Sequence, residues 1–151
     1  MINFFKKIYY EKYVKKSYSI SSVDLIIDRL FSKIKKGIYV DVGCNHPIKY
    51  NNTYLLHKRG WSGINIDLDD VSINEFNKMR EKDLNVNTMI TSIDNEEKDL
   101  FFYHKKSAIN TISKDLADKR SSKPKEIIKL KGKTLNTIIE ESIYKDKKIN
   151  L

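Results

Sequence analysis

Residues 38–67 have the order strand, helix, strand, and this stretch constrains the fold more than any other. Ile38–Val42 is a short β-branched run, and Gly63–Asp67 is a second run of the same kind. Between them, Thr53–Arg59 is expected to form a helix that ends at Gly60, because glycine is favoured just after a helix C-terminus. Two strands joined by such a helix are parallel neighbours. The sequence therefore predicts a βαβ unit within an α/β fold.

Both predicted strands carry an acid at or near the carboxyl end, the edge at which α/β sheets bind ligands. Asp41 lies in the first strand and Asp67 ends the second. A carboxylate at the second position accepts both hydroxyl protons of a ribose, so an adenosine-bearing ligand is expected. Gly43 permits a sharp turn, but Pro47 follows without the further glycines that cradle a pyrophosphate. A cofactor with adenosine and no phosphate therefore fits this pattern better than NAD or ATP.

The same stretch resembles the FkbM-type methyltransferases, a branch of the class I S-adenosylmethionine-dependent methyltransferases. The resemblance rests on DVGCNHP from Asp41, NNTYLL from Asn51, RGW from Arg59 and GINID from Gly63. Weaker matches extend it to Leu151. It implies a Rossmann-like, mostly parallel sheet with helices on both faces, and S-adenosyl-L-methionine as cofactor.

The resemblance also assigns residues to that cofactor. It implies that Asp67 holds the ribose and that the segment Ser92–Asp94 lies near the adenine. Apart from the family, Cys44 is expected to be a small apolar lining residue, because no His with a supporting acid lies near it in the sequence. The expected cofactor-binding residues are thus Asp41, Gly43, Cys44, Asn45, Asp67 and Ser92, and the resemblance places Asp41, Gly43 and Asn45 on the methionine side.

One departure from the family concerns its C-terminal half. The sequence ends at Leu151, where the resembled family continues into an acidic strand and loop of the form IDVEG. We therefore expect a sheet that is incomplete in its C-terminal half, with one edge of the strand Ile38–Val42 open. Because an unpaired strand edge favours association, self-association or a completing partner chain is expected.

The N-terminal segment, residues 1–20, is set apart from the predicted methyltransferase domain at residues 21–151 by its composition. It interleaves aromatic residues with lysines, a pattern that suits an anionic membrane surface or stacking on nucleic acid. Apolar residues at positions 4, 5, 8, 9 and 13 also follow helical spacing. The sequence favours a helix whose aromatic residues pack on the domain.

Composition limits the partners and the compartment. A formal net charge of +9 invites a nucleic-acid interpretation, but the lysines are scattered among acids, which is typical of a solvated surface. No specific nucleic-acid partner is therefore expected. Cys44, the single cysteine, excludes an internal disulfide and suits a cytoplasmic protein. No apolar run approaches the 18 or so residues of a membrane span. His57 and His104 share no ligand spacing with Cys44, so no metal site is expected.

The remaining elements follow from caps and apolar runs. The extended piece Leu100–His104 is expected at the edge of the main sheet. Helices are expected to begin at Ser21 or Ser22, at a capping box of Ser72 and Glu75, at Ser113 and at Asn136, with Asn51 or Asn52 capping the helix of the βαβ unit; the other strands are expected at Val86–Ile93, Glu126–Lys131 and Ile149–Leu151.

Three functions are compatible with the sequence. The first is S-adenosylmethionine-dependent methylation of a sugar or small-molecule hydroxyl, with the catalytic residue unassigned. His46 is a candidate base, but the sequence favours it as a loop residue that shapes the pocket. The second is a catalytically inactive remnant that still binds the cofactor. The third is a basic nucleic-acid-binding module that uses residues 1–20.

Overall fold

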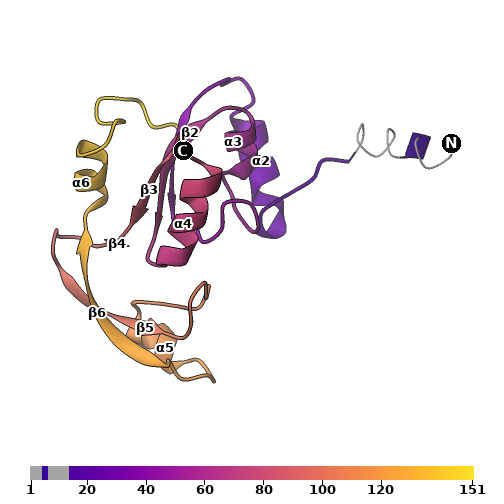
Figure 1. Cartoon of the computed structure of the whole chain (residues 1–151). Helices are drawn as coiled ribbons and strands as arrows, with labels where there is room; N and C mark the ends of the chain where they lie inside the picture. The colour runs from indigo at the N-terminus through magenta and orange to yellow at the C-terminus, as the bar shows by residue number, and fades with distance from the viewer. Residues whose placement is uncertain (1–4, 7–13) are drawn as a thin grey trace.

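The computed structural model describes residues 5–6 and 14–151, which form helices and two small sheets (Figure 1). Within these residues the first sheet is parallel with strand order β1-β2-β3, and the second has the order β4-β6-β5. The fold is therefore α/β, as the sequence predicts. In chain order the elements are η1 Ile20–Ser22, α2 Val23–Leu30, β1 Ile38–Val42, α3 Tyr54–Lys58, β2 Ser62–Asp67, α4 Asp70–Met79, β3 Leu84–Asn87, β4 Met89–Ile90, β5 Glu97–Phe102, α5 Lys114–Asp118, β6 Glu126–Lys133 and α6 Leu135–Glu140.

The predicted βαβ unit is present as β1, α3 and β2, and β3 pairs in parallel with the far edge of β2. The predicted N-cap residues of α3, Asn51 and Asn52, are wrong, because Thr53 is the N-cap residue. The side chain of Asn51 accepts the N–H of Thr53 itself, before the helix begins. Asn52 takes no part in this bond. The chain reverses after α3 at Gly60, whose φ of +88° is a conformation that glycine adopts without strain.

The parallel sheet is covered by helices on both faces (Figure 1). On one face, Ile64 of β2 packs against Ile138 of α6. On the other, Tyr39 of β1 packs with Leu56 of α3 and with Trp61, and α2 adds partly buried apolar side chains. Because neighbouring residues of a strand point to opposite faces, β1 supplies Tyr39 to this core and its neighbours Ile38 and Val40 to the other.

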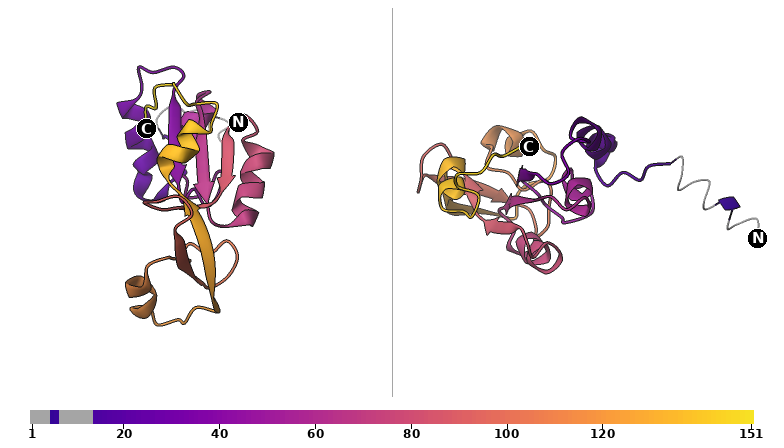
Figure 2. Two further views of the ribbon diagram at one scale, coloured as in Figure 1. Left: turned by 90° about the vertical axis from the view of Figure 1, so that its left-hand side faces the viewer. Right: turned by 90° about the horizontal axis from the view of Figure 1, so that it is seen from above.

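The second sheet corrects two predictions (Figure 2). The expected strand Val86–Ile93 is not one strand: Thr88 donates to the carbonyl of Asp67, and the chain then leaves the first sheet for the second. The piece predicted at Leu100–His104 is found as β5, which pairs antiparallel with β6 in the second sheet and not with the edge of the first. An apolar run predicts a strand but not its neighbour, because strand pairing is a tertiary contact.

Of the helix starts predicted at Ser72 and Ser113, the first is wrong and the second is confirmed. α4 begins at Asp70, because the Asp69 carboxylate accepts the N–H of Ser72 at 3.0 Å and takes the capping role predicted for Ser72. Ser113 caps α5 by accepting the N–H of Leu116, as predicted. The predicted partner of the capping box, Glu75, instead forms an ion pair with Lys106.

Helix α2 begins at Val23 with Ser22 as its N-cap residue, one of the two predicted, but neither Ser21 nor Ser22 makes a side-chain capping bond. The hydroxyl of Ser19 accepts the N–H of Asp24 at 2.9 Å, so the side-chain bond to the first turn comes from further upstream. The carboxylate of Asp24 accepts hydrogen bonds from the hydroxyl of Ser17 and from the N–H of Tyr18. The segment before α2 is thereby fixed to the first turn of the helix.

Segments at both ends of the described chain join the domain. The N–H of Asn150 donates to Ile38, and the N–H of Val40 donates to Leu151, both at 2.8 Å, so the last residues run along the edge of β1 opposite β2. Residues Ile149–Leu151 thus follow the edge of β1 without forming the predicted strand, and they occupy part of the edge that the sequence predicts to be open. Near the other end, Tyr18 packs edge-on against Tyr54 of α3 at a ring distance of 4.7 Å. The helix predicted from positions 4 to 13 lies mostly outside the described residues.

Candidate cofactor-binding site

A pocket of about 440 Å³ lies at the carboxyl ends of β1 and β2, between the two sheets. Gly43 and Asn45 line it from the loop after β1, and Asp67 lines it from the end of β2. The far wall comes from the crossing between the sheets at residues 88–90 and from residues 107–112. Three of the six predicted cofactor-binding residues thus share one pocket, although they come from two segments of the chain.

Asp67 joins the two loops that form the floor of the pocket. One carboxylate oxygen accepts the N–H of Asn45 at 2.8 Å, and the other accepts the N–H of Asp69 at 2.9 Å. An ionised carboxylate offers about four acceptor positions, so two remain for a ligand. Gly43, with φ of +72°, meets nothing where a Cβ would stand, so its backbone conformation and not lack of space calls for glycine.

The charge of the pocket is unusual for so basic a chain. Asp67 is the charged side chain among the described residues that line it, and no Lys, Arg or His contributes to the wall. The other lining groups are apolar, amide or hydroxyl side chains, among them Tyr50, Asn110 and Met89. A ligand with a hydroxyl pair or a positive charge is therefore favoured over one with phosphates.

The other three predicted residues lie outside the lining of the pocket. Asp41 points toward the residues just before α3, where its carboxylate accepts hydrogen bonds from Thr53 at 2.8 Å and from Asn51 at 3.1 Å. Burial raises the pKa of Asp41, and these two bonds lower it in part. Cys44 packs among apolar side chains of α4, and burial raises the pKa of its thiol. Ser92 donates to Glu96, the residue just before β5.

Behind the pocket, an arginine that the sequence analysis did not single out organises the loop after β1. Arg80, at the end of α4, is 1% exposed. Its Nη1 donates to Thr53 at 2.9 Å and its Nη2 to Asn51 at 2.8 Å, the two residues that hold Asp41. Nη2 also donates to the carbonyl of Pro47. The guanidinium thus ties residues 47–53 to α4 from inside the domain.

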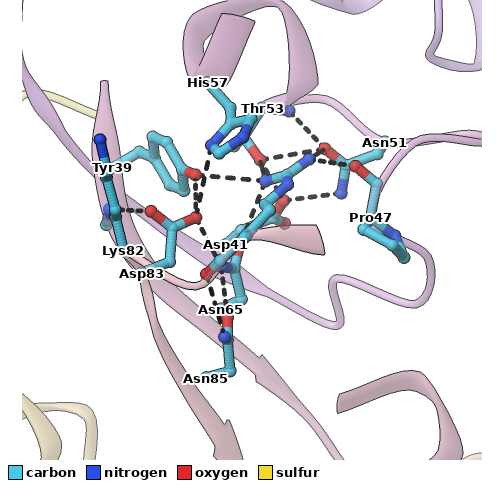
Figure 3. Close-up of polar contacts among 12 residues, drawn as sticks. Tyr39, Asp41, Pro47, Asn51, Thr53, His57, Asn65, Lys82, Asp83 and Asn85 are labelled. Atoms are coloured by element: carbon cyan, nitrogen blue, oxygen red, sulfur yellow. Dashed lines mark hydrogen bonds and ion pairs between the residues drawn. The ribbon is translucent and has the colours of Figure 1, made fainter. Parts of the chain in front are cut away.

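The same arginine reaches the sheet through a second group of residues, and Figure 3 shows Tyr39, Asp83 and Asn65 converging on one side of the network. Arg80 Nη1 donates to the hydroxyl of Tyr39 at 3.2 Å, and that hydroxyl donates to Asp83. Asp83 also accepts Asn65 Nδ2 at 3.0 Å and the N–H of Gly63 at 3.1 Å. Burial raises the pKa of Tyr39, which keeps its hydroxyl as a donor. The network therefore links both strands that end at the pocket.

The sequence does not predict that Arg80 is buried at the centre of a hydrogen-bond network. An arginine just after a helix is usually solvated, and in a lysine-rich chain no sequence pattern distinguishes a buried arginine from the many exposed cations. The one available signal was residue choice, because Arg is preferred over Lys where several fixed acceptors must be met at once.

His46, the candidate base, does not line the pocket. Its Nδ1 accepts the N–H of Ile48 at 3.0 Å and that of Lys49 at 2.9 Å, which places the proton of the neutral ring on Nε2. Nε2 lies 3.9 Å from Glu75, and burial lowers the pKa of His46. With its acceptor nitrogen already used, His46 serves in this arrangement to shape the loop and not to remove a proton.

In residues 5–6 and 14–151, no cluster of three or more His, Cys, Asp or Glu side chains is arranged to hold a metal ion. The same residues contain no helix with the length and hydropathy to cross a bilayer. Comparison of the chain with protein-family models, with curated proteins and with solved structures found no match.

Proposed function

We propose that this chain binds S-adenosyl-L-methionine in the pocket between its two sheets and is a methyltransferase of Rossmann-like fold, related to the FkbM type that its sequence resembles. The observation that carries the proposal is the position of Asp67. It ends the second strand of a parallel βαβ unit, faces the pocket and keeps acceptor capacity free for a ribose.

The remaining lining residues suit the rest of that cofactor. A wall without cationic side chains favours a ligand with a sulfonium and no phosphate, since a phosphate would lack counter-charges there. Apolar side chains such as Leu68 and Met89 offer a surface for a purine ring. When bound, S-adenosyl-L-methionine supplies an activated methyl group.

The chain's own part in the reaction is to bind, orient and exclude water. Asp67 and the N–H groups it fixes set the position of the ligand, and Arg80 holds the loop at residues 47–53 behind them. By resemblance the acceptor is a hydroxyl of a sugar or small molecule; the single cysteine suits a cytoplasmic setting. A self-associated form or a partner chain would complete the acceptor side.

A second candidate, a cofactor-binding chain without catalysis, is favoured by one observation. Among the described lining residues Asp67 is the only titratable carboxylate, and it is engaged with two loop N–H groups. A chain with no free base in the pocket can bind the cofactor without deprotonating a hydroxyl.

The test is calorimetric titration of the purified chain with S-adenosylhomocysteine. Asp67→Ala should abolish saturable binding, and Asp146→Ala, a change at an exposed acid, should leave it unchanged. Ala108→Trp is a second block, because Ala108 is exposed and lines the pocket, so filling the pocket there disturbs little of the fold.

Circular dichroism confirms that each variant is folded before titration. A folded wild-type chain that does not bind S-adenosylhomocysteine would overturn the proposal, as would binding that survives Ala108→Trp. If binding is found, transfer of a labelled methyl group to hydroxyl acceptors separates the methyltransferase from the non-catalytic candidate.

A further inference from the structure

Helix α2 has apolar side chains on two sides, and only one side packs on the domain. Ile27, with Phe31 just after the helix, packs against the buried cluster of Tyr39 and its neighbours. On the outward side, Val23, Ile26 and Leu30 are 39%, 59% and 74% exposed. Their spacing of three and four residues puts them in one row along the helix. A surface helix usually presents polar side chains there, so this row calls for an explanation.

The charges of α2 are divided between the same two sides. Both acids of the helix are used inward: Asp24 is 1% exposed and accepts from Ser17, and Asp28 pairs with Arg59 at 2.8 Å. On the outward side, Arg29 borders the apolar row.

Lys33, just beyond the helix, borders the same row. Leu25, Ile26, Arg29, Leu30, Ser32 and Lys33 line one shallow hollow of about 490 Å³. Within residues 5–6 and 14–151, no acid lies within ion-pair distance of Arg29 or Lys33. The outward side therefore combines exposed aliphatic groups with cations and presents no acid.

We propose that this outward side of α2, defined as Val23, Ile26, Arg29, Leu30 and Lys33, docks on the surface of an anionic lipid bilayer. Such a surface offers phosphate groups to the cations and an apolar layer just beneath them to the aliphatic side chains. The net charge of +9 and the lysines of residues 1–20, which precede α2 in the sequence, add to the attraction.

Other occupants match this side less well. Nucleic acid would pair with the cations but would leave the aliphatic row without a partner, because single strands are held by stacking on aromatic rings. A second copy docked through the same side would bring Arg29 and Lys33 of both chains together, and like charges in contact are unfavourable. The inference is independent of the proposed methyl transfer.

The experiment is co-sedimentation of the full chain with two kinds of vesicle, phosphatidylcholine alone and an equimolar mixture of phosphatidylcholine and phosphatidylglycerol. The double variant Ile26→Asp/Leu30→Asp tests the docking side. The matched control is Ile127→Asp/Ile143→Asp, which places the same two charges at isoleucines that are 58% and 70% exposed on β6 and after α6.

We expect the wild-type chain to bind the mixed vesicles and not the neutral ones, and binding to weaken as salt is added. The α2 double variant should bind at least about tenfold more weakly, because charged groups replace the two most exposed aliphatic contacts, and the control should change about twofold or less. Circular dichroism shows that both variants are folded.

Three results would overturn the proposal. One is equal binding of the α2 variant and its control, which would assign any lipid binding to residues 1–20. The second is absence of binding to the mixed vesicles. The third is equal binding to neutral and mixed vesicles, which would remove the role of Arg29 and Lys33.

Discussion

Strand β2 presents different kinds of side chain to the two faces of the parallel sheet. Along β2, Ile64 and Ile66 point to α6 and pack among aliphatic and aromatic side chains. Asn65, between them, points to the other face, where its amide meets Asp83 and Asn85. On β2, one face is held by apolar area, which tolerates small shifts, and the other by directed hydrogen bonds, which do not, although Tyr39 of β1 adds apolar packing to that second face.

This difference between the faces shows which contacts position the loop of the candidate site. The face toward α6 adds burial, and its Ile66 and Ile90 line the pocket with apolar side chains that form no directed bonds. On the opposite face, Arg80 fixes Asn51, Thr53 and the carbonyl of Pro47, and so sets the path of the loop that carries Gly43 and Asn45 into the pocket. A buried network of this kind stabilises one arrangement only if every member keeps a partner.

The largest effect is expected where that network loses its centre. Arg80→Ala should lower the free energy of unfolding by roughly 4 kcal/mol, because buried acceptors on Thr53, Asn51 and Tyr39 lose their donor and Asp83 its nearby cation. Urea denaturation measures it, with Arg29→Ala at an exposed arginine as the control. A loss no larger than that of the control would mean that the polar face is not organised by Arg80.

A somewhat smaller loss is expected on the apolar face. Ile64→Ala removes a fully buried side chain and should cost about 3 kcal/mol, from lost transfer free energy and the cavity that remains. Ile127→Ala, at an isoleucine that is 58% exposed, should cost less than about 0.5 kcal/mol. Ile64→Ala and Arg80→Ala should also differ in ligand binding, which calorimetric titration measures. Ile64→Ala should leave ligand binding in the pocket nearly unchanged, whereas Arg80→Ala should weaken it.

The smallest effect is a pH dependence of stability, tested by comparing wild type with the Asp41→Asn variant. Burial raises the pKa of Asp41 above 3.8, so above that raised pKa the folded chain bears the cost of a buried charge. As pH falls through it, the folded chain takes up a proton before the unfolded chain does, and wild type gains stability relative to Asp41→Asn.

Urea midpoints of both proteins, measured from pH 7 downward, follow the change in their difference, and wild type should gain stability relative to Asp41→Asn as pH falls. The amide oxygen of Asn can still accept from Thr53 and Asn51, so the comparison isolates the charge. A difference that is constant with pH, or that grows as pH falls, would contradict the stated direction.

Much of the fold could be predicted because the signals are local. The runs Ile38–Val42 and Gly63–Asp67, with Gly60 between them, have the residue types of strands and a helix stop, and each was found close to its predicted place. The candidate site was predictable to the extent that parallel strands end at one edge. That rule brought Gly43, Asn45 and Asp67 together in one pocket.

What the sequence determined, then, is which segments become strands and helices and which acid ends the second strand, since these depend on neighbours within a few residues. The tertiary structure alone decided which sheet β4 and β5 join, that Asp41 turns from the pocket to Thr53, and that Arg80 is buried at the centre of the domain. Each of these depends on partners far away along the chain. Contacts of that kind form only when the whole domain packs, so no local pattern of residues records them.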